Sequence, residues 1–162
     1  MQQPTILIAT PHPRNRHLVP DLCKGLSDYK IVDIKSQNEL TIEIVEKHKP
    51  NFIFFPHWSW KIPEKIYARY NCVIFHMTDL PYGRGGSPLQ NLIIRGHQNT
   101  MITALKCNAE MDAGPVYLKE NLSLDGTADD ILLRASMLIK EIIIQIVQKK
   151  IEPQPQYGKV VE

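Results

Sequence analysis

The sequence lacks any long hydrophobic run and any cluster of basic residues. Its longest apolar stretches, around Ile53–Phe55 and Ile142–Ile144, are far shorter than the roughly 20 residues of a membrane span. The N-terminus shows no charged segment followed by an apolar one, as a targeting peptide would. Nineteen Lys and Arg against 17 Asp and Glu leave a net charge of only +2. We therefore expect a cytoplasmic protein with no membrane partner and no extended nucleic-acid surface.

Cysteine is scarce, and no metal-binding spacing is present. Cys23, Cys72 and Cys107 are odd in number and widely separated, which argues against a disulfide framework or a zinc site. We expect buried, reduced thiols that serve packing. The six histidines form no H-E-x-x-H or similar ligand pattern, so no metal is predicted.

The length of 162 residues and the 43% hydrophobic content predict one globular domain with one core. We assign residues 1–152 to a catalytic domain and residues 153–162, with their prolines in a polar context, to a tail. The sequence leaves a homo-oligomer open.

Short apolar runs alternate with segments of helical period, which is typical of a parallel sheet covered on both faces. The fold prediction is α/β, a Rossmann-like, open and mostly parallel sheet with helices on both faces. The expected strands are 5–10, 29–34, 52–55, 72–75, 100–106 and 115–119, and the expected helices are 18–26, 42–46, 63–70, 88–96 and 128–147.

A glycine-rich loop, Tyr82–Ser87, follows the fourth expected strand. Ligands of open parallel sheets lie at the carboxyl ends of strands, so this loop is a candidate binding segment. It lacks the lysine of a phosphate-binding P-loop, and a flexible turn into a helix beginning at Ser87-Pro88 is the structural alternative.

Four segments occur in one order: His76, Leu80-Pro81, Arg84–Gln90 and Met111–Val116. Together they resemble the formyltransferases that use 10-formyltetrahydrofolate, a family that acts on glycinamide ribonucleotide, methionyl-tRNA or nucleotide sugars. The resemblance runs from about Phe52 to Leu133. It implies a formyltransferase-like fold, a 10-formyltetrahydrofolate donor, no metal, and catalytic roles for His76 and Asp112.

One position departs from the family pattern. The family carries an Asn two residues before the His, and Ile74 stands there in this sequence. Strand side chains alternate, so Ile74 and His76 share a face and hydrocarbon replaces the oxyanion-binding amide. An active enzyme then needs another donor, for which His57, Thr78, a nearby backbone N–H or protonated His76 are candidates.

The resemblance also implies two binding regions. The folate would lie against the 57–62 loop and the segment just before the catalytic aspartate, at Trp58, Ser59, Trp60, Ile62 and Met111. The two indoles have alternative interpretations as core residues or as a base-stacking platform. The acceptor would lie along Tyr82, Arg84, Gly85, Gly86, Ser87 and Gln90. Arg14, Asn15 and Arg16 form either a second phosphate contact or a solvated basic loop.

The function expected from the sequence is transfer of a formyl group to the amine of a small acceptor. We expect a nucleotide-linked amino sugar, because the sequence shows no RNA-binding extension like that of tRNA-modifying members. The alternatives are glycinamide ribonucleotide or methionyl-tRNA as acceptor, hydrolysis of 10-formyltetrahydrofolate, and a non-catalytic folate- or nucleotide-binding module.

Overall fold

The computed structural model describes residues 3–161, whose contacts divide into two compact units. The N-terminal unit extends to Ile74, and the C-terminal unit begins at Phe75.

The N-terminal unit is built on parallel strands. They are β1 (Thr5–Ala9), β2 (Lys30–Ile34), β3 (Phe52–Phe55) and the beginning of β4 (Cys72–His76). The order is β2-β1-β3-β4, and each neighbouring pair is parallel. Every residue of β1 is buried, as expected for a strand covered on both faces.

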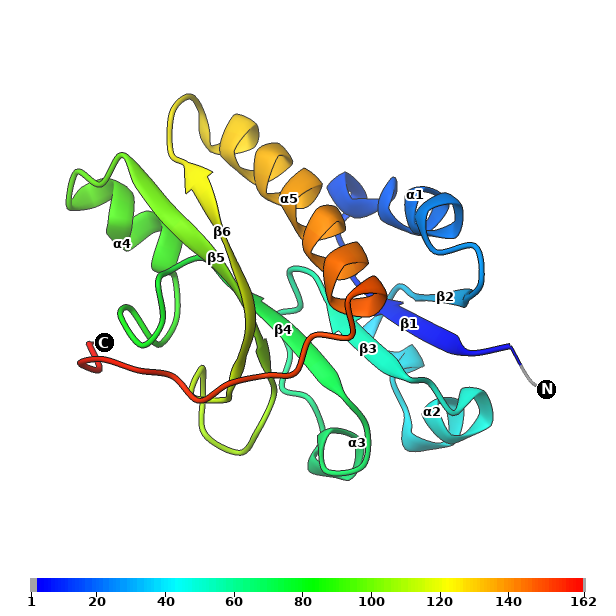
Figure 1. Cartoon of the computed structure of the whole chain (residues 1–162). Coiled ribbons are helices and arrows are strands. Elements are labelled where there is room, and N and C mark those ends of the chain that lie inside the picture. The colour runs from blue at the N-terminus through cyan, green and yellow to red at the C-terminus, as the bar shows by residue number, and fades with distance from the viewer. Residues whose placement is uncertain (1–2, 162) are drawn as a thin grey trace. The chain divides into compact units, whose positions relative to one another are not determined.

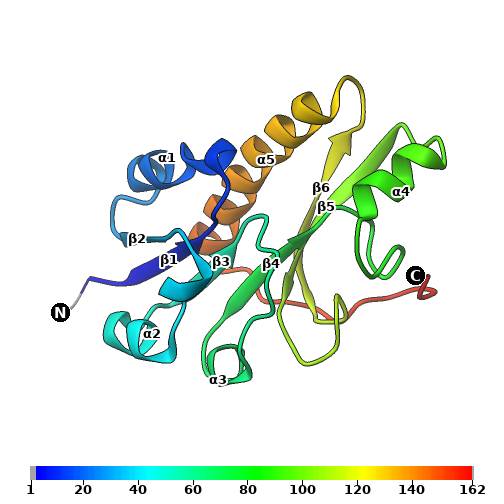
Figure 2. The same cartoon turned by 180° about the vertical axis from the view of Figure 1, so that it is seen from behind.

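Short helices connect these strands. Helix α1 lies on one side of the sheet, and α2 and α3 lie on the other (Figures 1 and 2). The Thr41 side chain accepts a hydrogen bond from the backbone N–H of Ile44, which caps the start of α2. The segments are 3₁₀ turns at Pro13–Asn15 and Gln37–Glu39, and helices α1 (Leu18–Gly25), α2 (Ile42–His48) and α3 (Glu64–Tyr67).

The C-terminal unit is an antiparallel strand pair with a long helix. It contains α4 (Pro88–Ile94), β5 (Asn99–Lys106), β6 (Val116–Ser123) and α5 (Ala128–Gln148). The strands β5 and β6 pair antiparallel with an irregularity at Ala104/Leu105. Helix α5 lies along this pair (Figure 1).

Helix α5 has the start and the periodicity that the sequence predicts. Thr127 and Asp130 form a reciprocal capping box, with each side chain accepting from the other residue's backbone N–H. The helix buries one face at helical spacing: Ile131, Ala135, Ile139, Ile142, Ile143, Ile146 and Val147.

The predicted α/β fold with a mostly parallel sheet is confirmed, and several local predictions are wrong. The helix expected over 63–70 is shorter, from Glu64 to Tyr67. Strand β6 continues to Ser123 instead of ending near residue 119, and Pro13–Asn15 is a 3₁₀ turn instead of an irregular loop. Ser87 has a left-handed φ of 52° and its side chain caps nothing, so Pro88 alone marks the start of α4. Cys23 is exposed and does not serve packing, whereas Cys72 is buried as predicted.

The segment after α5 pairs with the rest of its unit. Gln154 exchanges two backbone hydrogen bonds with Val116, and Val161 forms a bridge with Tyr82. We call residues 154–161 the strap. The last residue of the expected tail, Glu162, lies outside the described residues.

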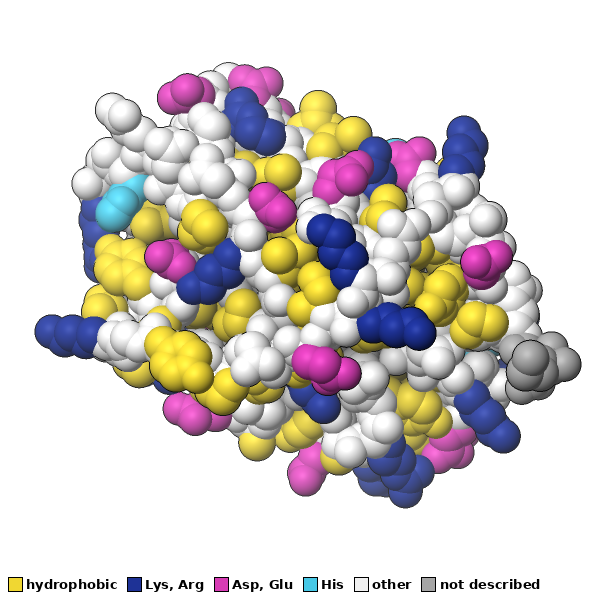
Figure 3. Space-filling view, in the orientation of Figure 1, with side chains coloured by type: hydrophobic (Ala, Val, Ile, Leu, Met, Phe, Trp, Pro, Cys, Tyr) yellow, Lys and Arg dark blue, Asp and Glu magenta, His cyan; other side chains and the backbone are white. Residues whose placement is uncertain are grey.

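The surface carries mixed charge on the face shown in Figure 3, where Lys and Arg alternate with Asp and Glu among apolar side chains. Across residues 3–161, no helix has the length and apolar character needed to cross a bilayer.

Candidate active site

The C-terminal unit brings together both residues that the sequence analysis assigns to catalysis. His76 is the last residue of β4, and Asp112 lies in the loop between β5 and β6. The His76 Nδ1 and Asp112 Oδ1 atoms are 3.6 Å apart, and both side chains are almost fully buried, with 9% and 12% exposed. Such a pair can move a proton while remaining shielded from bulk water.

Two backbone groups of the glycine-rich loop hold this pair. The His76 Nε2 lies 2.6 Å from the carbonyl oxygen of Gly83, and the Gly85 N–H donates to Asp112 Oδ2 at 3.0 Å. The Gly83 carbonyl and an ionised carboxylate are both acceptors. An imidazole with a proton on each nitrogen would donate to the Gly83 carbonyl and hold its positive charge beside the Asp112 carboxylate.

Backbone geometry explains two of the glycines beside the pair. Gly83 has a φ of 72°, and an added Cβ would lie 2.6 Å from the Thr78 Cγ2. At Gly114 an added Cβ would lie 1.7 Å from the Lys106 carbonyl oxygen. These close approaches bring the loops near enough for Asp112, itself at a φ of 54°, to contact His76.

The loop after β4 is anchored by side chains of β5 and β6. The Thr103 hydroxyl donates to the Thr78 carbonyl at 2.6 Å, and the Thr100 hydroxyl donates to the Met77 carbonyl at 3.1 Å. The Lys119 Nζ donates to the Leu80 carbonyl at 2.7 Å. The loop that carries the candidate acceptor-binding residues is thus fixed at several points before any ligand binds.

The predicted acceptor-binding residues all lie on this loop or at the start of α4. Arg84 is half-buried, and its guanidinium contacts Glu110 and Gln156, whereas Gly86, Ser87 and Gln90 are exposed. A hollow with a volume of about 500 Å³ lies beside Tyr82, whose ring is 6.2 Å from that of His97. Its lining is Asp79, Tyr82, Leu92, His97, Asn99, Thr100, Met101 and Asn121.

The C-terminal unit also contains Thr78, a candidate oxyanion donor, and Met111, a candidate folate-binding residue. The Thr78 side chain is buried, and its hydroxyl donates to the Gly83 carbonyl at 3.4 Å, so the role as oxyanion donor stays a prediction. Met111, assigned to folate binding, is 71% exposed.

The segment after β3, in the N-terminal unit, holds the other predicted residues. Trp58 contacts Phe55 and Trp60 edge to face, with ring centroids 5.6 Å and 4.9 Å apart. His57 has a left-handed φ of 55°. Ser59 is exposed, Trp60 is 38% exposed and Ile62 is buried. Among residues 3–161, the buried side-chain atoms without a hydrogen-bond partner are His57 Nε2 and Trp58 Nε1.

The basic loop Arg14–Arg16 fits its predicted alternatives, a phosphate contact or a solvated loop, only in part. Asn15 is buried and donates from Nδ2 to the Thr10 hydroxyl at 3.0 Å, so a solvated loop is the wrong description of this residue. Arg14 contacts the His12 ring.

We expect the stability of the N-terminal unit to fall in mild acid because of His57. Burial lowers the pKa of His57 to about 4 from its ordinary 6.5, and Arg14 and His12 add to this effect. Between pH 6.5 and pH 4 the imidazole of His57 is therefore protonated in the unfolded chain but neutral in the folded chain. The free energy of unfolding falls as the pH drops through this range. The loss is about 3 kcal/mol over that range.

Urea unfolding followed by Trp58 and Trp60 emission measures this loss. His57→Gln removes the titrating group, so the variant should lose less stability than the wild type between pH 6.5 and pH 4.5. Equal losses in the two proteins would show that the His57 ring is not buried in its neutral form.

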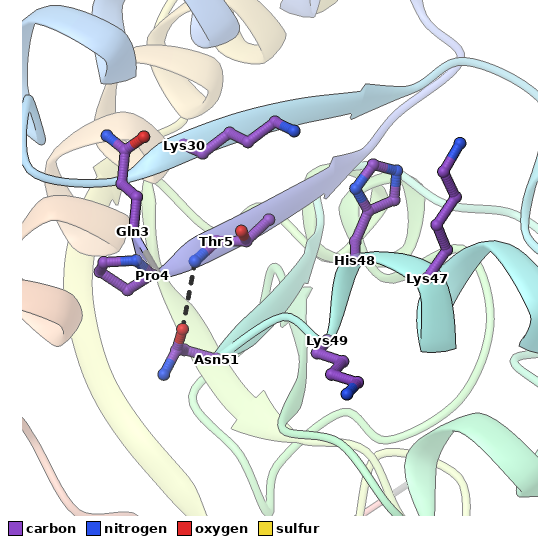
Figure 4. Close-up of a pocket in the computed structure, with 8 residues that line it drawn as sticks. All are labelled: Gln3, Pro4, Thr5, Lys30, Lys47, His48, Lys49 and Asn51. Carbon is purple, nitrogen blue, oxygen red and sulfur yellow. Dashed lines mark hydrogen bonds between the residues drawn. The ribbon is translucent and has the colours of Figure 1, made fainter. Parts of the chain in front are cut away.

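A second hollow, in the N-terminal unit, shares no residue with the candidate site. Figure 4 shows Lys30, Lys47 and Lys49 around it and the hydrogen bond from the Thr5 N–H to Asn51 Oδ1. Its volume is about 500 Å³, and its lining is Gln3, Pro4, Thr5, Lys30, Lys47, His48, Lys49 and Asn51. Within the described part of the chain, no three His, Cys, Asp or Glu side chains are grouped to hold a metal ion.

The fold and the sites described above define an α/β protein with a buried His76–Asp112 pair, and comparison with known proteins identifies its family. No family model matches the sequence. The structure of methionyl-tRNA formyltransferase from Clostridium thermocellum is 44% identical, with a TM-score of 0.94 over 98% of this chain and 70% of that chain. The chain belongs to the formyltransferase family.

One further relative and one further structure extend the comparison. Methionyl-tRNA formyltransferase of Rickettsia typhi is 31% identical over 113 residues, which cover 67% of this chain and 37% of that protein. This chain thus spans little more than a third of the length of that relative. The formyltransferase PseJ from Anoxybacillus kamchatkensis, solved with a UDP-linked formamido sugar and tetrahydrofolate, is 18% identical. Its TM-score of 0.72, over 96% of this chain and 84% of that chain, shows a shared fold.

Proposed function

We propose that the chain transfers a formyl group from 10-formyltetrahydrofolate to a primary amine. The observation that carries this proposal is the buried His76–Asp112 pair, held by Gly83 and Gly85 in a member of the formyltransferase family.

The residues of the pair have complementary roles in the proposed reaction. The bound donor supplies the formyl carbon that the amine attacks and the nitrogen that receives a proton. His76 takes up the proton that the attacking amine loses and delivers it to that nitrogen, since an imidazole can both accept and donate a proton. Asp112 orients the ring through Nδ1 and stabilises its positive charge. The oxyanion contact requires another hydrogen-bond donor, since the Ile74 side chain offers none. The side chains of His57 and Thr78 stay the candidates.

The segment 57–62 suits a folate-derived donor. A buried polar nitrogen without a partner costs free energy, which a hydrogen bond to a ligand would recover. His57 Nε2 and Trp58 Nε1 are such atoms, and the indole faces suit a flat pterin ring. We propose that these residues, with Ser59, Trp60 and Ile62, bind the donor. Met111, predicted for the same role, belongs to the C-terminal unit.

We expect an unreactive 10-formyltetrahydrofolate analogue to quench the tryptophan emission. The protein has two tryptophans, Trp58 and Trp60, so the signal reports on this segment alone. Trp58→Phe should weaken binding by about tenfold, because stacking area and the indole N–H are lost together. Unchanged emission, together with no heat of binding in calorimetry, would contradict a donor site at this segment.

The chemical identity of the acceptor is a second, more specific part of this proposal. Relatives at 44% and 31% identity are named methionyl-tRNA formyltransferases, which favours the α-amine of an aminoacyl-tRNA. The nucleotide-linked amino sugar expected from the sequence stays a second candidate. The hollow beside Tyr82, with its two aromatic rings and two asparagine amides, is of a size and chemistry that suit a nucleoside.

A competition assay separates these acceptors. Methionyl-tRNA, UDP- and dTDP-linked amino sugars, glycinamide ribonucleotide and water are offered with one donor pool, and products are identified by mass spectrometry. Formyl-methionyl-tRNA as the dominant product supports the first acceptor, and a formamido sugar supports the second. Formate released at the same rate with and without amines would instead indicate a hydrolase.

A further inference from the structure

The strap supplies a polar side chain to the active site that the sequence analysis did not single out. Gln156 is half-buried, and each of its amide atoms makes two hydrogen bonds. Its Oε1 accepts from Arg84 Nε at 3.3 Å and from Arg84 Nη2 at 2.9 Å. Its Nε2 donates to the carbonyls of Asp112 at 2.8 Å and Gly114 at 2.9 Å. An amide has two donor hydrogens and one acceptor oxygen, so all its capacity is used here.

These four bonds join the two loops that make the catalytic pair. One loop carries Asp112, and the other, the glycine-rich loop, carries Arg84. The same two loops also meet directly, through the bond from the Gly85 N–H to Asp112 Oδ2 and through the Arg84–Glu110 ion pair at 3.9 Å. Gln156 is therefore hydrogen-bonded both to the main chain of Asp112 and to the glycine-rich loop, whose Gly83 carbonyl contacts His76.

Backbone pairing at both ends fixes where the Gln156 side chain lies. On one side, Gln154 and Val116 exchange hydrogen bonds of 2.7 Å and 2.8 Å. On the other side, the Val161 carbonyl accepts from the N–H groups of Gly83 at 2.6 Å and Arg84 at 3.1 Å. A side chain held between two anchored points keeps its hydrogen bonds at a low entropy cost.

We propose that Gln156 is a positioning residue of the active site, whose side-chain amide sets the Asp112 carboxylate against the His76 ring. It acts through Asp112 and Arg84 and does not itself contact the reacting atoms. This inference rests on the proposed formyl transfer, and its test includes a measurement that needs no turnover.

The test compares Gln156→Met with a matched control, Gln154→Met. Both replace a strap glutamine by a side chain of similar length, but Gln154 is exposed and is held through its backbone. We expect Gln156→Met to lower kcat by about 10- to 100-fold, because small misplacements of catalytic groups are costly. The KM for the donor should change less than about twofold, since the donor segment is untouched. Gln154→Met should match the wild type in both.

Amide hydrogen exchange supplies the measurement without turnover. The Gly85 N–H, bonded to Asp112, should exchange at least about tenfold faster in Gln156→Met than in Gln154→Met, with core amides unchanged. Gln156→Glu is the second variant: it keeps an acceptor for Arg84 but has no N–H for the Asp112 and Gly114 carbonyls. It should resemble Gln156→Met, and circular dichroism confirms that each variant folds.

The outcomes separate the two proposals. An inactive wild type would contradict the proposed function, while the exchange of the Gly85 N–H would still decide the role of Gln156. Wild-type exchange in Gln156→Met, or wild-type kcat in Gln156→Glu, would overturn the positioning role.

Discussion

His76→Ala and Asp112→Ala should each reduce formyl transfer by more than about a hundredfold, the loss expected for an acid–base group. His76 is the group placed to hold the proton, and removing its ring leaves the Gly83 carbonyl and Asp112 Oδ1 without their imidazole neighbour. Removing Asp112 frees the ring to rotate and leaves the Gly85 N–H without its acceptor. Both losses should fall mainly on kcat, because the contacts act on the transition state.

The double variant and two surface controls sharpen this prediction. Residues that act as a unit have non-additive effects, so His76→Ala combined with Asp112→Ala should be little worse than His76→Ala alone. His48→Ala and Asp28→Ala remove the same residue types outside the site and should keep wild-type rates. Near-native turnover of either single variant, with the same confirmed acceptor, would remove that residue from the mechanism.

Gly114→Ala should destabilise the protein by about 3 kcal/mol, at the upper end of the range for overpacking, because the added methyl meets backbone. The Cβ would lie 1.7 Å from the Lys106 carbonyl oxygen and 2.9 Å from its carbon. Relief of the clash shifts the loop that carries Asp112, so we expect activity to fall as well.

Gly86→Ala is the control for this second prediction. No atom lies within 4 Å of the Cβ position at Gly86, and its φ is not in the left-handed region. Its stability should stay within about 0.5 kcal/mol of the wild type in urea unfolding followed by circular dichroism. A similarly small change for Gly114→Ala would contradict the close approach of the two loops.

Much of the fold follows from local patterns in the sequence. Apolar runs such as Ile6–Ala9 and Ile53–Phe55 are buried strands because both faces of a parallel sheet are covered, and a short unbroken apolar run bounded by turn residues identifies them. The long helix was predictable from its capping box and its apolar spacing. The prediction that Ser87 caps the start of α4 failed. A capping serine must reach the N–H groups of the first helical turn with its side chain, and the left-handed backbone of Ser87 prevents this.

The candidate site was predictable where a motif carried it. His76 and Asp112 stand in segments that resemble the family, and the fold places them 3.6 Å apart. Gln156 was not predictable, because its bonds to Arg84 and Asp112 join positions 72 and 44 residues away in sequence. Thr103 was missed for the same reason, since a hydroxyl in a strand gives no sign of the distant carbonyl it will contact.

Ile74 is the position at which this chain lacks the oxyanion-binding amide expected from its family. It lies in β4, opposite Phe55 in the parallel register and two residues before His76. Its side chain offers no hydrogen bond to an oxyanion, and the loss of one such donor costs about a hundredfold to a thousandfold in rate. Activity in the wild type would therefore require a donor elsewhere, for which His57 and Thr78 are the candidates.

The most direct measurement of formyl transfer follows both products of the wild-type reaction at once. Wild type, His76→Ala and Ile74→Asn are each incubated with 10-formyltetrahydrofolate and methionyl-tRNA or an amino sugar nucleotide. We expect the wild type to form tetrahydrofolate and formylated amine in equal amounts, and His76→Ala to form neither at a comparable rate. An inactive wild type together with an active Ile74→Asn variant would contradict this account and identify a binding module instead.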